Sequence, residues 1–209
     1  MLPPKNMRTL VLALLSVLAL AACSSPSAGT SATSAGSATA SSWTYTDDTG
    51  NTITLPAKPQ RIVAFADQAL SLMSYGVKPA GIFARVDVKT DPRFAGVDLG
   101  DVKILGTSYG EIDLEALAEL APDLIVTAVY PSDRQGTLDP KSPYYGMKDF
   151  EQQKKIEAIA KVAAVKVGGE GRAVIESNAK LALALGADQA KVDSDKAAFD
   201  QAGKLKLSQ

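Results

Sequence analysis

The sequence predicts an α/β fold: a mostly parallel central sheet flanked by helices, with a β-hairpin before it and a long helix after it. Two observations carry this prediction. Short apolar runs typical of buried strands alternate along the chain with segments of helical character, an order that indicates helices packed on a parallel sheet. Within residues 106–126, GTSYGEIDLEALAELAPDLIV, a short helix leads directly into such a strand. The loops that flank these strands then lie where ligands usually bind.

The helix within residues 106–126 is expected to begin at Asp113, a residue type favoured as an N-cap. Pro122 should end it soon after Leu120. Its apolar stripe, about three turns long, would consist of Leu114, Leu117, Ala118 and Ala121. Residues 124–128 follow as five apolar or β-branched positions, which predict a strand covered on both faces.

The elements before this segment follow from turn and strand signals. Residues 43–46 and 52–55 flank the Asp47-Asp48-Thr49-Gly50 turn and predict the hairpin. This turn lacks the further acidic positions of a calcium loop, so we expect no cation there. The first core strand is expected at 61–65. A helix over 67–75 follows, with Leu70, Leu72 and Met73 as its inward side chains and Gly76 as its C-cap.

The remaining elements are expected in the following order: strands at 81–84 and 102–105 with a polar loop at 85–100 between them, an irregular loop at 130–146, a helix at 148–161, a strand at 162–167, and helices at 170–185 and 188–207. Loops as long as 130–146 inside a compact domain are usually functional or mobile.

Composition excludes several kinds of function. The chain is 46% hydrophobic and 22% charged with a net charge of −1, so nothing indicates a nucleic-acid partner. It contains no histidine and one cysteine. A histidine-based triad, a histidine metal cluster, an intrachain disulfide and a cysteine metal cluster are therefore all excluded within this chain.

The N-terminus predicts a lipoprotein signal peptide over residues 1–22. Lys5 and Arg8 precede an uncharged apolar stretch, which is shorter than the roughly 20 residues that a membrane span needs and fits a secretory leader. The stretch ends Leu-Ala-Ala-Cys and resembles the bacterial lipobox, so the lone Cys23 is the expected lipidation site. An ordinary signal peptide or a short anchor is the alternative. Residues 23–42, rich in Ser, Ala and Thr, are expected to form a flexible linker.

Several motifs occur in a recognisable order: Pro-Gln-Arg-Ile-Val at 59–63, Gly-Val-Lys-Pro-Ala-Gly at 76–81, and Asp-Leu-Glu-Ala-Leu to Pro-Asp-Leu-Ile-Val over 113–126. Together they resemble the substrate-binding lipoproteins of ABC importers, in the group with a rigid linking helix that binds ferric siderophores, haem or cobalamin. The resemblance implies two α/β lobes joined by a helix, with the ligand in the cleft between them. Residues 43–187 would be the N-terminal lobe and residues 188–209 the linking helix. The chain would then be truncated, with the second lobe absent.

The resemblance also implies a function. The expected protein is a lipid-anchored, monomeric solute-binding component on the extracytoplasmic face of the cell membrane, which captures a ferric siderophore and delivers it to an ABC permease. It would be no enzyme and would have no cofactor other than its ligand. A one-lobed adaptor lipoprotein and a cobalamin- or haem-binding relative are the alternatives. An enzyme is disfavoured by the absence of histidine and of a Gly-x-Ser-x-Gly motif.

Ligands in open α/β sheets bind beyond the carboxyl ends of the strands, so residues directly after the expected strands are the binding candidates. They are Asp67, Gln68, Arg85, Ser108, Tyr109, Tyr130 and Arg134. Arginine offers forked, charge-assisted donors and tyrosine a flat amphipathic wall, which suit a large, often anionic ferric complex. The alternative is that the arginines are solvated and the tyrosines pack at an edge. Tyr144 and Tyr145 are further candidates of the same kind.

Glu115 is the docking candidate. It matches the exposed glutamate with which this family meets arginines of the permease, and a carboxylate opposite a basic socket steers docking. Glu119, one turn further along the helix, could share this role. The alternative is that both are solvated charges on a helix face.

Overall fold

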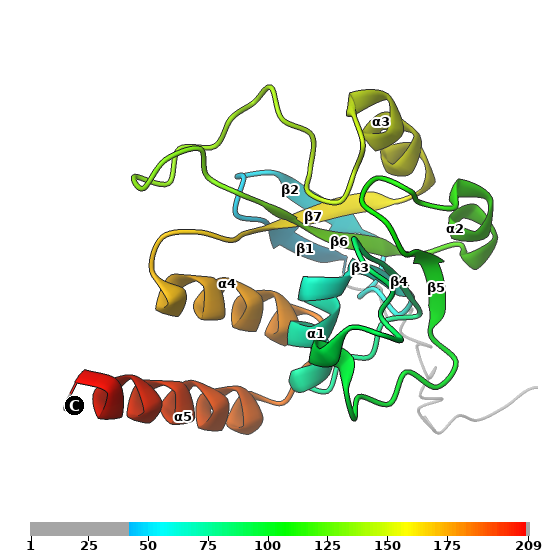
Figure 1. The fold of residues 1–209 in the computed structure, drawn as a ribbon. Coiled ribbons are helices and arrows are strands. Elements are labelled where there is room, and N and C mark those ends of the chain that lie inside the picture. The colour runs from blue at the N-terminus through cyan, green and yellow to red at the C-terminus, as the bar shows by residue number, and fades with distance from the viewer. Residues whose placement is uncertain (1–41, 208–209) are drawn as a thin grey trace, which may run out of the picture. The chain divides into compact units, whose positions relative to one another are not determined.

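The computed structural model describes residues 42–207, which fold around a five-stranded parallel sheet (Figure 1). The strands are β1 (Trp43–Thr46), β2 (Thr52–Leu55), β3 (Ile62–Phe65), β4 (Gly81–Phe83), β5 (Lys103–Gly106), β6 (Leu124–Val129) and β7 (Lys161–Lys166). The α-helices are α1 (Ala66–Ser74), α2 (Leu114–Leu120), α3 (Phe150–Ile159), α4 (Gly171–Ala184) and α5 (Gln189–Leu207), and η1 (Pro92–Phe94) is a 3₁₀ turn. The predicted α/β fold class, with its hairpin and its long final helix, is confirmed.

The order of strands in the sheet is β5-β4-β3-β6-β7, and every neighbouring pair is parallel. The chain therefore builds outward from β3 through β4 to β5, and then returns to the other side of β3 with β6 and β7. Between β3 and β6 the direction of winding reverses. In open α/β sheets this switch point, at the carboxyl ends of the strands, is where ligands bind.

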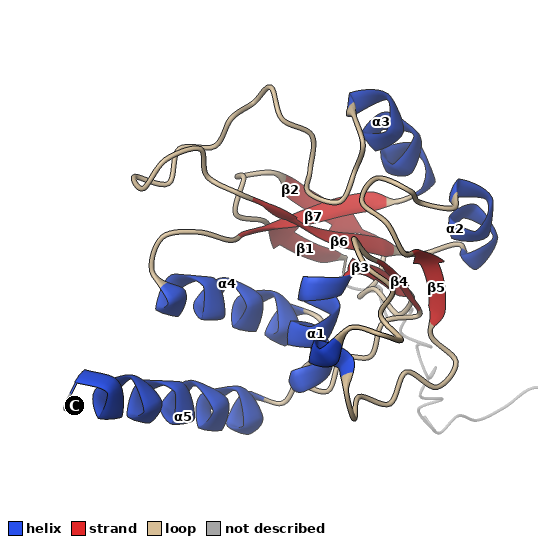
Figure 2. Ribbon diagram, in the orientation of Figure 1, coloured by secondary structure: helices blue, strands red, loops and turns tan. Residues whose placement is uncertain are grey.

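Helices cover both faces of the sheet, and each face has its own hydrophobic core. Figure 2 shows α1 and α4 on one side of the strands and α2 and α3 on the other. Strand β3 serves both cores, because Ile62 and Ala64 pack toward the first and Val63 and Phe65 toward the second. All four side chains are buried, as expected of a central parallel strand.

Helix α2 has the predicted bounds, Leu114–Leu120, but a smaller buried face than predicted. It spans seven residues, about two turns, and only Leu117 of the predicted stripe is fully buried. Ala118 and Ala121 are exposed, so their assignment to the inward face was wrong. The physical reason is that Ala121 lies beyond the helix, as its left-handed C-cap with φ 45°, and that two turns bring only Leu117 fully inward. The predicted start holds, since the Asp113 carboxylate accepts a hydrogen bond from Ala116 N.

Two further details differ from the sequence prediction. In α1 the fully buried leucine is Leu72, whereas Leu70 and Met73 are only half-buried, because the helix turns Ala69 and Leu72 toward the sheet. The loop at 85–100 is not simply polar. It contains η1 and buries Val88 and Phe94 in the first core.

The hairpin turn closes the outer edge of β7. The Asp47 carboxylate accepts a hydrogen bond from Ala164 N at 3.0 Å, and the Asp48 carboxylate accepts one from Lys166 N at 2.8 Å. Asp47 also accepts from the backbone N–H groups of Thr49 and Asn51. Exposed sheet edges are sites of unwanted pairing, and here two aspartates occupy the backbone donors of Ala164 and Lys166 on this edge.

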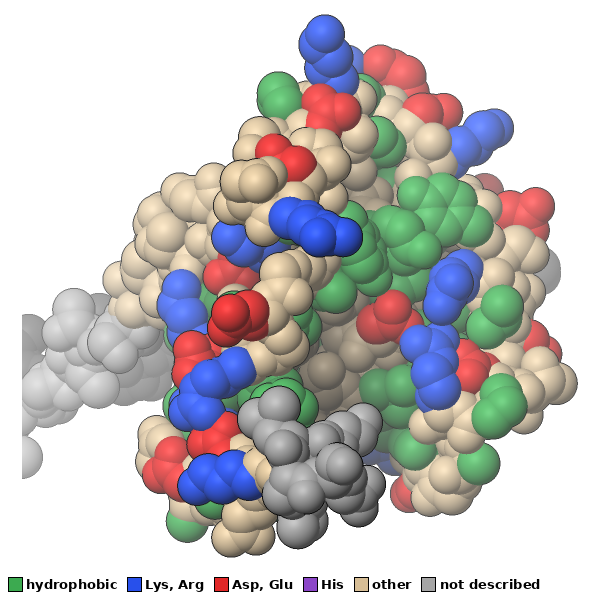
Figure 3. Space-filling model, turned by 60° about the vertical axis from the view of Figure 1, so that its left-hand side comes forward, with side chains coloured by type: hydrophobic (Ala, Val, Ile, Leu, Met, Phe, Trp, Pro, Cys, Tyr) green, Lys and Arg blue, Asp and Glu red, His purple; other side chains and the backbone are tan. Residues whose placement is uncertain are grey.

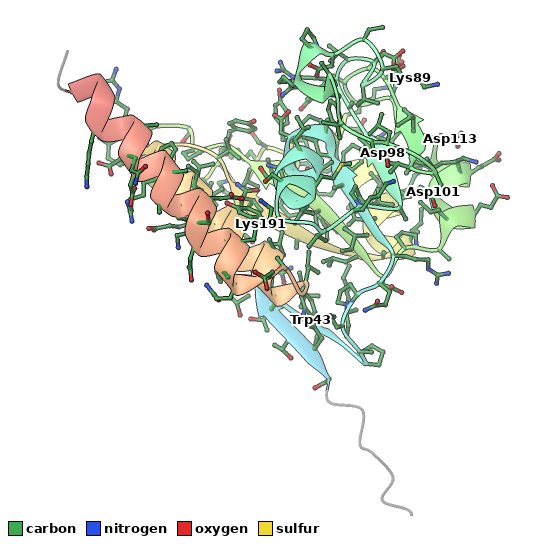
Figure 4. The ribbon with its side chains drawn as sticks, turned by 90° about the horizontal axis from the view of Figure 1, so that it is seen from below. Trp43, Lys89, Asp98, Asp101, Asp113 and Lys191 are labelled. Carbon is green, nitrogen blue, oxygen red and sulfur yellow. The ribbon has the colours of Figure 1, made fainter. Side chains whose placement is uncertain are left out.

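Helix α5 lies along α4 and carries the chain away from the sheet. Val192 is completely buried against the first core, and Arg172 of α4 forms an ion pair with Asp200 of α5. At the other end of α4, the indole of Trp43 donates a hydrogen bond to the carbonyl of Ala184 at 2.8 Å. Figure 4 labels Trp43 on the hairpin strand and Lys191 on α5.

The signal peptide, Cys23 and the linker lie outside the described residues, so these predictions stay predictions. Between residues 42 and 207 the structure contains no helix with the length and apolar character that crossing a bilayer requires.

Candidate functional site

The carboxyl edge of the sheet brings Asp67 and Tyr130 close together at the switch point. Asp67 lies in the first turn of α1, directly after β3, and Tyr130 follows β6. Burial raises the pKa of the Tyr130 hydroxyl, and the negative charge of Asp67 raises it further. Figure 3 turns this edge toward the reader and shows hydrophobic and aromatic side chains gathered around a hollow, with Lys and Arg side chains beside it.

Tyr145 is held at the end of β6 by backbone contacts. Its N–H donates to the carbonyl of Ala128 at 2.9 Å, and its carbonyl accepts from the buried Thr127 hydroxyl at 2.5 Å. The next residue, Gly146, has φ 87°, and a Cβ there would lie 2.8 Å from the Phe65 ring. Only glycine permits this conformation at such a close approach. The segment is therefore fixed against the sheet although it belongs to a long loop.

Three tyrosines meet at this point, and we call Tyr109, Tyr130 and Tyr145 the tyrosine cluster. The ring centroid of Tyr145 lies 5.3 Å from that of Tyr109 and 4.5 Å from that of Tyr130. On its inner side Tyr145 packs edge-on against Phe65 at 5.2 Å. These are the separations at which aromatic pairs attract. Tyr109 and Tyr130 are 49% and 43% exposed, so the cluster leaves aromatic side chains accessible to solvent.

The cluster forms one wall of a cavity of about 350 Å³, within the range of small-molecule sites. Its other lining residues are Val129, Leu138, Asp139, Ser142, Pro143 and Lys148. A larger hollow of about 530 Å³ lies between β2, Tyr144 and the start of β7. We favour the tyrosine-lined cavity as the site, because it alone of the two lies at the switch point and combines clustered aromatic rings with a few polar groups.

An ion network borders the cluster. The guanidinium of Arg93, in η1, contacts Asp67 at 2.5 Å and Asp91 at 2.6 Å. Hydrogen bonds from Arg93 hold the pKa of the Asp91 carboxyl below its usual range, and the two carboxylates raise the pKa of Arg93. Arg93 is thus committed to two protein carboxylates. Its charge and that of Arg85 also act on Tyr130, whose pKa they lower against the effect of burial.

The structure brings some of the predicted site residues together and leaves others apart. Tyr109 and Tyr130 line the cavity, and the exposed Arg85 acts on Tyr130 from beside it. Ser108 and Arg134 are exposed and do not line the cavity. Gln68 is only 2% exposed and faces inward from α1, with its Oε1 lacking a hydrogen-bond partner among the described residues. Whether any of them contacts a ligand stays a prediction.

Sequence reasoning missed Arg93 and placed too little weight on Tyr145. The signal for Arg93 was local: Asp91 caps η1 by accepting from Arg93 N, and Asp-Pro-Arg is a natural start for such a turn. Tyr145 had no comparable signal, since its position depends on contacts with Thr127 and Ala128, which lie in β6.

Glu115 and Glu119 are both exposed on α2. Neither lines the tyrosine-lined cavity. The helix therefore presents two carboxylates to solvent outside the site, and docking through them stays a prediction.

Comparison with solved structures identifies the architecture. DesE, a ferric-siderophore receptor protein from Streptomyces coelicolor, matches 77% of this chain with 32% sequence identity and a TM-score of 0.64, and the match covers 53% of DesE. The chain carries one lobe of a periplasmic-binding-protein fold. The resemblance to the substrate-binding proteins of iron importers, expected from the motifs, is thereby confirmed. No family model and no curated protein sequence matches the chain.

Two further structures share this lobe at lower identity. Staphylococcus aureus SirA, solved in complex with staphyloferrin B, is 22% identical over 76% of this chain and 47% of SirA, with a TM-score of 0.50. A periplasmic solute binding protein from Mycobacterium smegmatis is 21% identical over 80% of this chain and 54% of that protein, with a TM-score of 0.52. The chain thus spans about half the length of each of these proteins.

Proposed function

We propose that this chain belongs to the solute-binding component of an ABC importer and captures a ferric siderophore or a related iron complex. The observation that carries the proposal is the tyrosine-lined cavity at the switch point of the sheet. Its support is the 32% identity to DesE, a ferric-siderophore receptor. In this proposal Cys23 carries the lipid that tethers the protein to the extracytoplasmic face of the membrane, and a permease receives the ligand.

The cavity suits part of a large ligand rather than all of it. At about 350 Å³ it is near the lower end of ligand pockets, so it would take one arm of an iron complex while the rest remains outside. The accessible rings of the tyrosine cluster would provide contact area at low entropic cost. Arg85, exposed beside the cluster, offers forked donors to anionic oxygen atoms of the complex.

The proposed role involves binding and release without bond chemistry. Iron enters as cargo inside the ligand, and the proposal assigns no catalytic residue and no resident cofactor to the chain. In the proposal the side chains recognise the organic shell of the complex.

A titration of the full chain with ferric siderophores tests the proposal. Hydroxamate and catecholate complexes would be added separately, and quenching of the intrinsic Trp43 and tyrosine fluorescence recorded. We expect saturable quenching by at least one complex, and dissociation constants raised about 5- to 10-fold by Tyr109→Ala, since stacked aromatic contacts contribute about 1 kcal/mol. Phe150→Ala is the matched control, because Phe150 is similarly exposed but does not line the cavity.

Saturable binding of no ferric complex would overturn ligand capture by this chain. If cobalamin or haem alone gave saturable quenching, the iron–siderophore assignment would be replaced by one of these ligands. Equal loss of affinity in Tyr109→Ala and Phe150→Ala would move the site away from the cavity.

Docking through Glu115 is the second part of the proposal. Exchange of Glu115 for Arg reverses a charge that would meet arginines of the permease, so permease-dependent uptake should fall while ligand affinity stays the same. Glu119→Arg makes the same charge change one turn along α2. Unchanged uptake in both variants would contradict docking by this helix.

A further inference from the structure

Gln152 bridges the two loops that carry the walls of the cavity. It lies in the first turn of α3 and is half-buried. Its Oε1 accepts a hydrogen bond from Lys148 N at 2.7 Å, and its Nε2 donates one to the carbonyl of Gly110 at 2.8 Å. Lys148 itself lines the cavity, and Gly110 follows Tyr109. One amide group therefore connects the loop of Tyr109 with the loop of Tyr145.

The two loops approach each other closely at this bridge. Gly110 has φ 73°, and a Cβ there would lie 2.9 Å from Lys148 Cβ and 3.0 Å from Lys148 Cα. No side chain fits between the backbones at such distances. The position of Tyr109 relative to Tyr145, with ring centroids 5.3 Å apart, thus depends on how firmly the loops are held together beside them.

Capping of α3 explains only half of what Gln152 does. Asp149 is the N-cap, and its carboxylate accepts from Gln152 N at 2.8 Å. In a capping box the side chain three residues later returns an acceptor to the N-cap backbone. Here Gln152 Oε1 serves Lys148, the residue before the cap. A glutamate would supply that acceptor equally well, but only an amide also supplies the donor that reaches Gly110.

We propose that Gln152 is a positioning residue, which sets the geometry of the tyrosine cluster by fixing the 107–112 loop against the 143–149 loop. The effect on ligand affinity rests on the proposed function. A cavity wall that is already ordered before binding does not have to be ordered by the ligand, which strengthens binding. Its structural part concerns the loops alone and can be tested without any ligand.

Gln152→Glu is the decisive variant, since it keeps the capping acceptor, removes the donor and sets a carboxylate against the Gly110 carbonyl. Backbone hydrogen exchange would be measured on the ligand-free full chain. We expect amides of residues 107–112 to exchange about 5- to 30-fold faster, as loss of a hydrogen bond to a local segment predicts. Unchanged protection of this loop would overturn the inference.

Gln153→Glu is the matched control, with the same charge change at the next position of α3. Gln153 Oε1 accepts from Tyr144 N, and its Nε2 donates to Glu157 rather than to the 107–112 loop. In the Gln153→Glu variant, backbone amides of residues 107–112 should exchange at the same rate as in the unaltered chain. Hydrogen exchange at 107–112 that is equally faster in both variants would contradict the inference. So would exchange that is faster by the same factor throughout the lobe, because Gln152 would then only contribute to general stability.

Gly110→Ala provides a second route to the same result, because it forces the loops apart while Gln152 remains. It should accelerate exchange in the same segment. Titration of both altered chains with the ferric complex that binds the unaltered chain should then give dissociation constants raised about 5-fold or more, with Gln153→Glu unchanged. If no ferric complex binds the unaltered chain, the proposed function fails, whereas the exchange data still decide the role of Gln152.

Discussion

At the scale of single residues, Asp123 connects two motifs that lie far apart in the sequence. Its carboxylate accepts hydrogen bonds from the backbone N–H groups of Gln60 and Arg61, both at 2.8 Å, across 63 and 62 residues. The Pro-Gln-Arg-Ile-Val motif and the Pro-Asp-Leu-Ile-Val motif are therefore two halves of one contact. This contact aligns the starts of β3 and β6, the strands that flank the switch point.

Replacement of Asp123 by alanine should lower the free energy of unfolding at neutral pH by about 1–2 kcal/mol, because two backbone donors lose their acceptor. Burial raises the pKa of the Asp123 carboxyl. The two backbone N–H groups and the Arg61 charge together lower it by more, so the pKa lies below its usual value. A carboxyl whose pKa is depressed by folding stabilises the protein above its unfolded pKa of about 3.9 and loses this effect as the pH falls through the folded pKa.

The loss of unfolding free energy caused by Asp123→Ala should therefore be smaller at acidic pH. Urea denaturation at neutral pH and in the range below pH 3.9 measures it. Asp123→Asn, which retains one acceptor oxygen but does not titrate, should show a smaller deficit at neutral pH. A deficit of Asp123→Ala that is the same at both pH values would contradict the assigned role of the charge.

At the scale of elements, the long loop between β6 and α3 has a rigid end. Its last part, from Tyr144 to Met147, is held by Gln153, Thr127 and the packing of Met147 in the second core. Its outer part, from Ser132 to Gln135, is exposed. The loop thus combines an anchored segment that carries Tyr145 with an exposed segment that carries Arg134.

Gly146→Ala should destabilise the protein more than Gly136→Ala, although both glycines belong to this loop and have φ near 88°. At Gly136 the nearest side-chain atom is Lys166 Nζ at 3.5 Å, so alanine incurs only the left-handed backbone cost of about 1–2 kcal/mol. At Gly146 the added methyl also meets Phe65 and Phe83 at 2.8 and 3.0 Å, and overpacking adds about 1–3 kcal/mol.

Urea denaturation of the two variants measures the difference. Equal unfolding free energies would contradict the prediction and show that the anchored end of the loop can move to accommodate the added methyl group. Gly146→Ala should in addition weaken ligand binding, because it displaces Tyr145 from the cluster.

The sequence predicts elements better than it predicts their contacts. Strand β6 was predictable because a strand buried on both faces appears in the sequence as a continuous apolar run. The hairpin was predictable because its turn residues are characteristic. The inward face of α2 was not, because a helix of seven residues has only two turns, which bury Leu117 alone. Tyr109 and Tyr130 could be placed at the site from the rule for strand ends alone. The central place of Tyr145 and the role of Gln152 could not, since they depend on contacts with Thr127 and with Gly110, which lie far away in sequence. Arg93 had a local signal in its capping by Asp91, but its contact with Asp67 is long-range.

At the scale of the whole molecule, one sheet separates two cores, and apolar side chains of its strands pack into both. Leu72 in the first core and Leu117 in the second are each 1% exposed. Because the same strands form one wall of each core, we expect the lobe to unfold as a unit.

Leu72→Ala and Leu117→Ala should each lower the free energy of unfolding by about 2–5 kcal/mol. Far-ultraviolet circular dichroism and Trp43 fluorescence should report one coincident transition in both variants, although Trp43 packs only against the first core. Val86→Ala, at a side chain 45% exposed, should change stability by less than about 0.5 kcal/mol. A Leu117→Ala transition seen by circular dichroism but not by fluorescence would show that the cores unfold separately.

The closed edge of β7 also sets an order of events during synthesis. The hairpin is the first described element to leave the ribosome, yet Asp47 finds Ala164 across 117 residues and Trp43 finds Ala184 across 141. Neither contact can form until those residues have been added, and contacts of such long range slow folding. The hairpin can therefore dock on the lobe only after β7 and α4 have been translated.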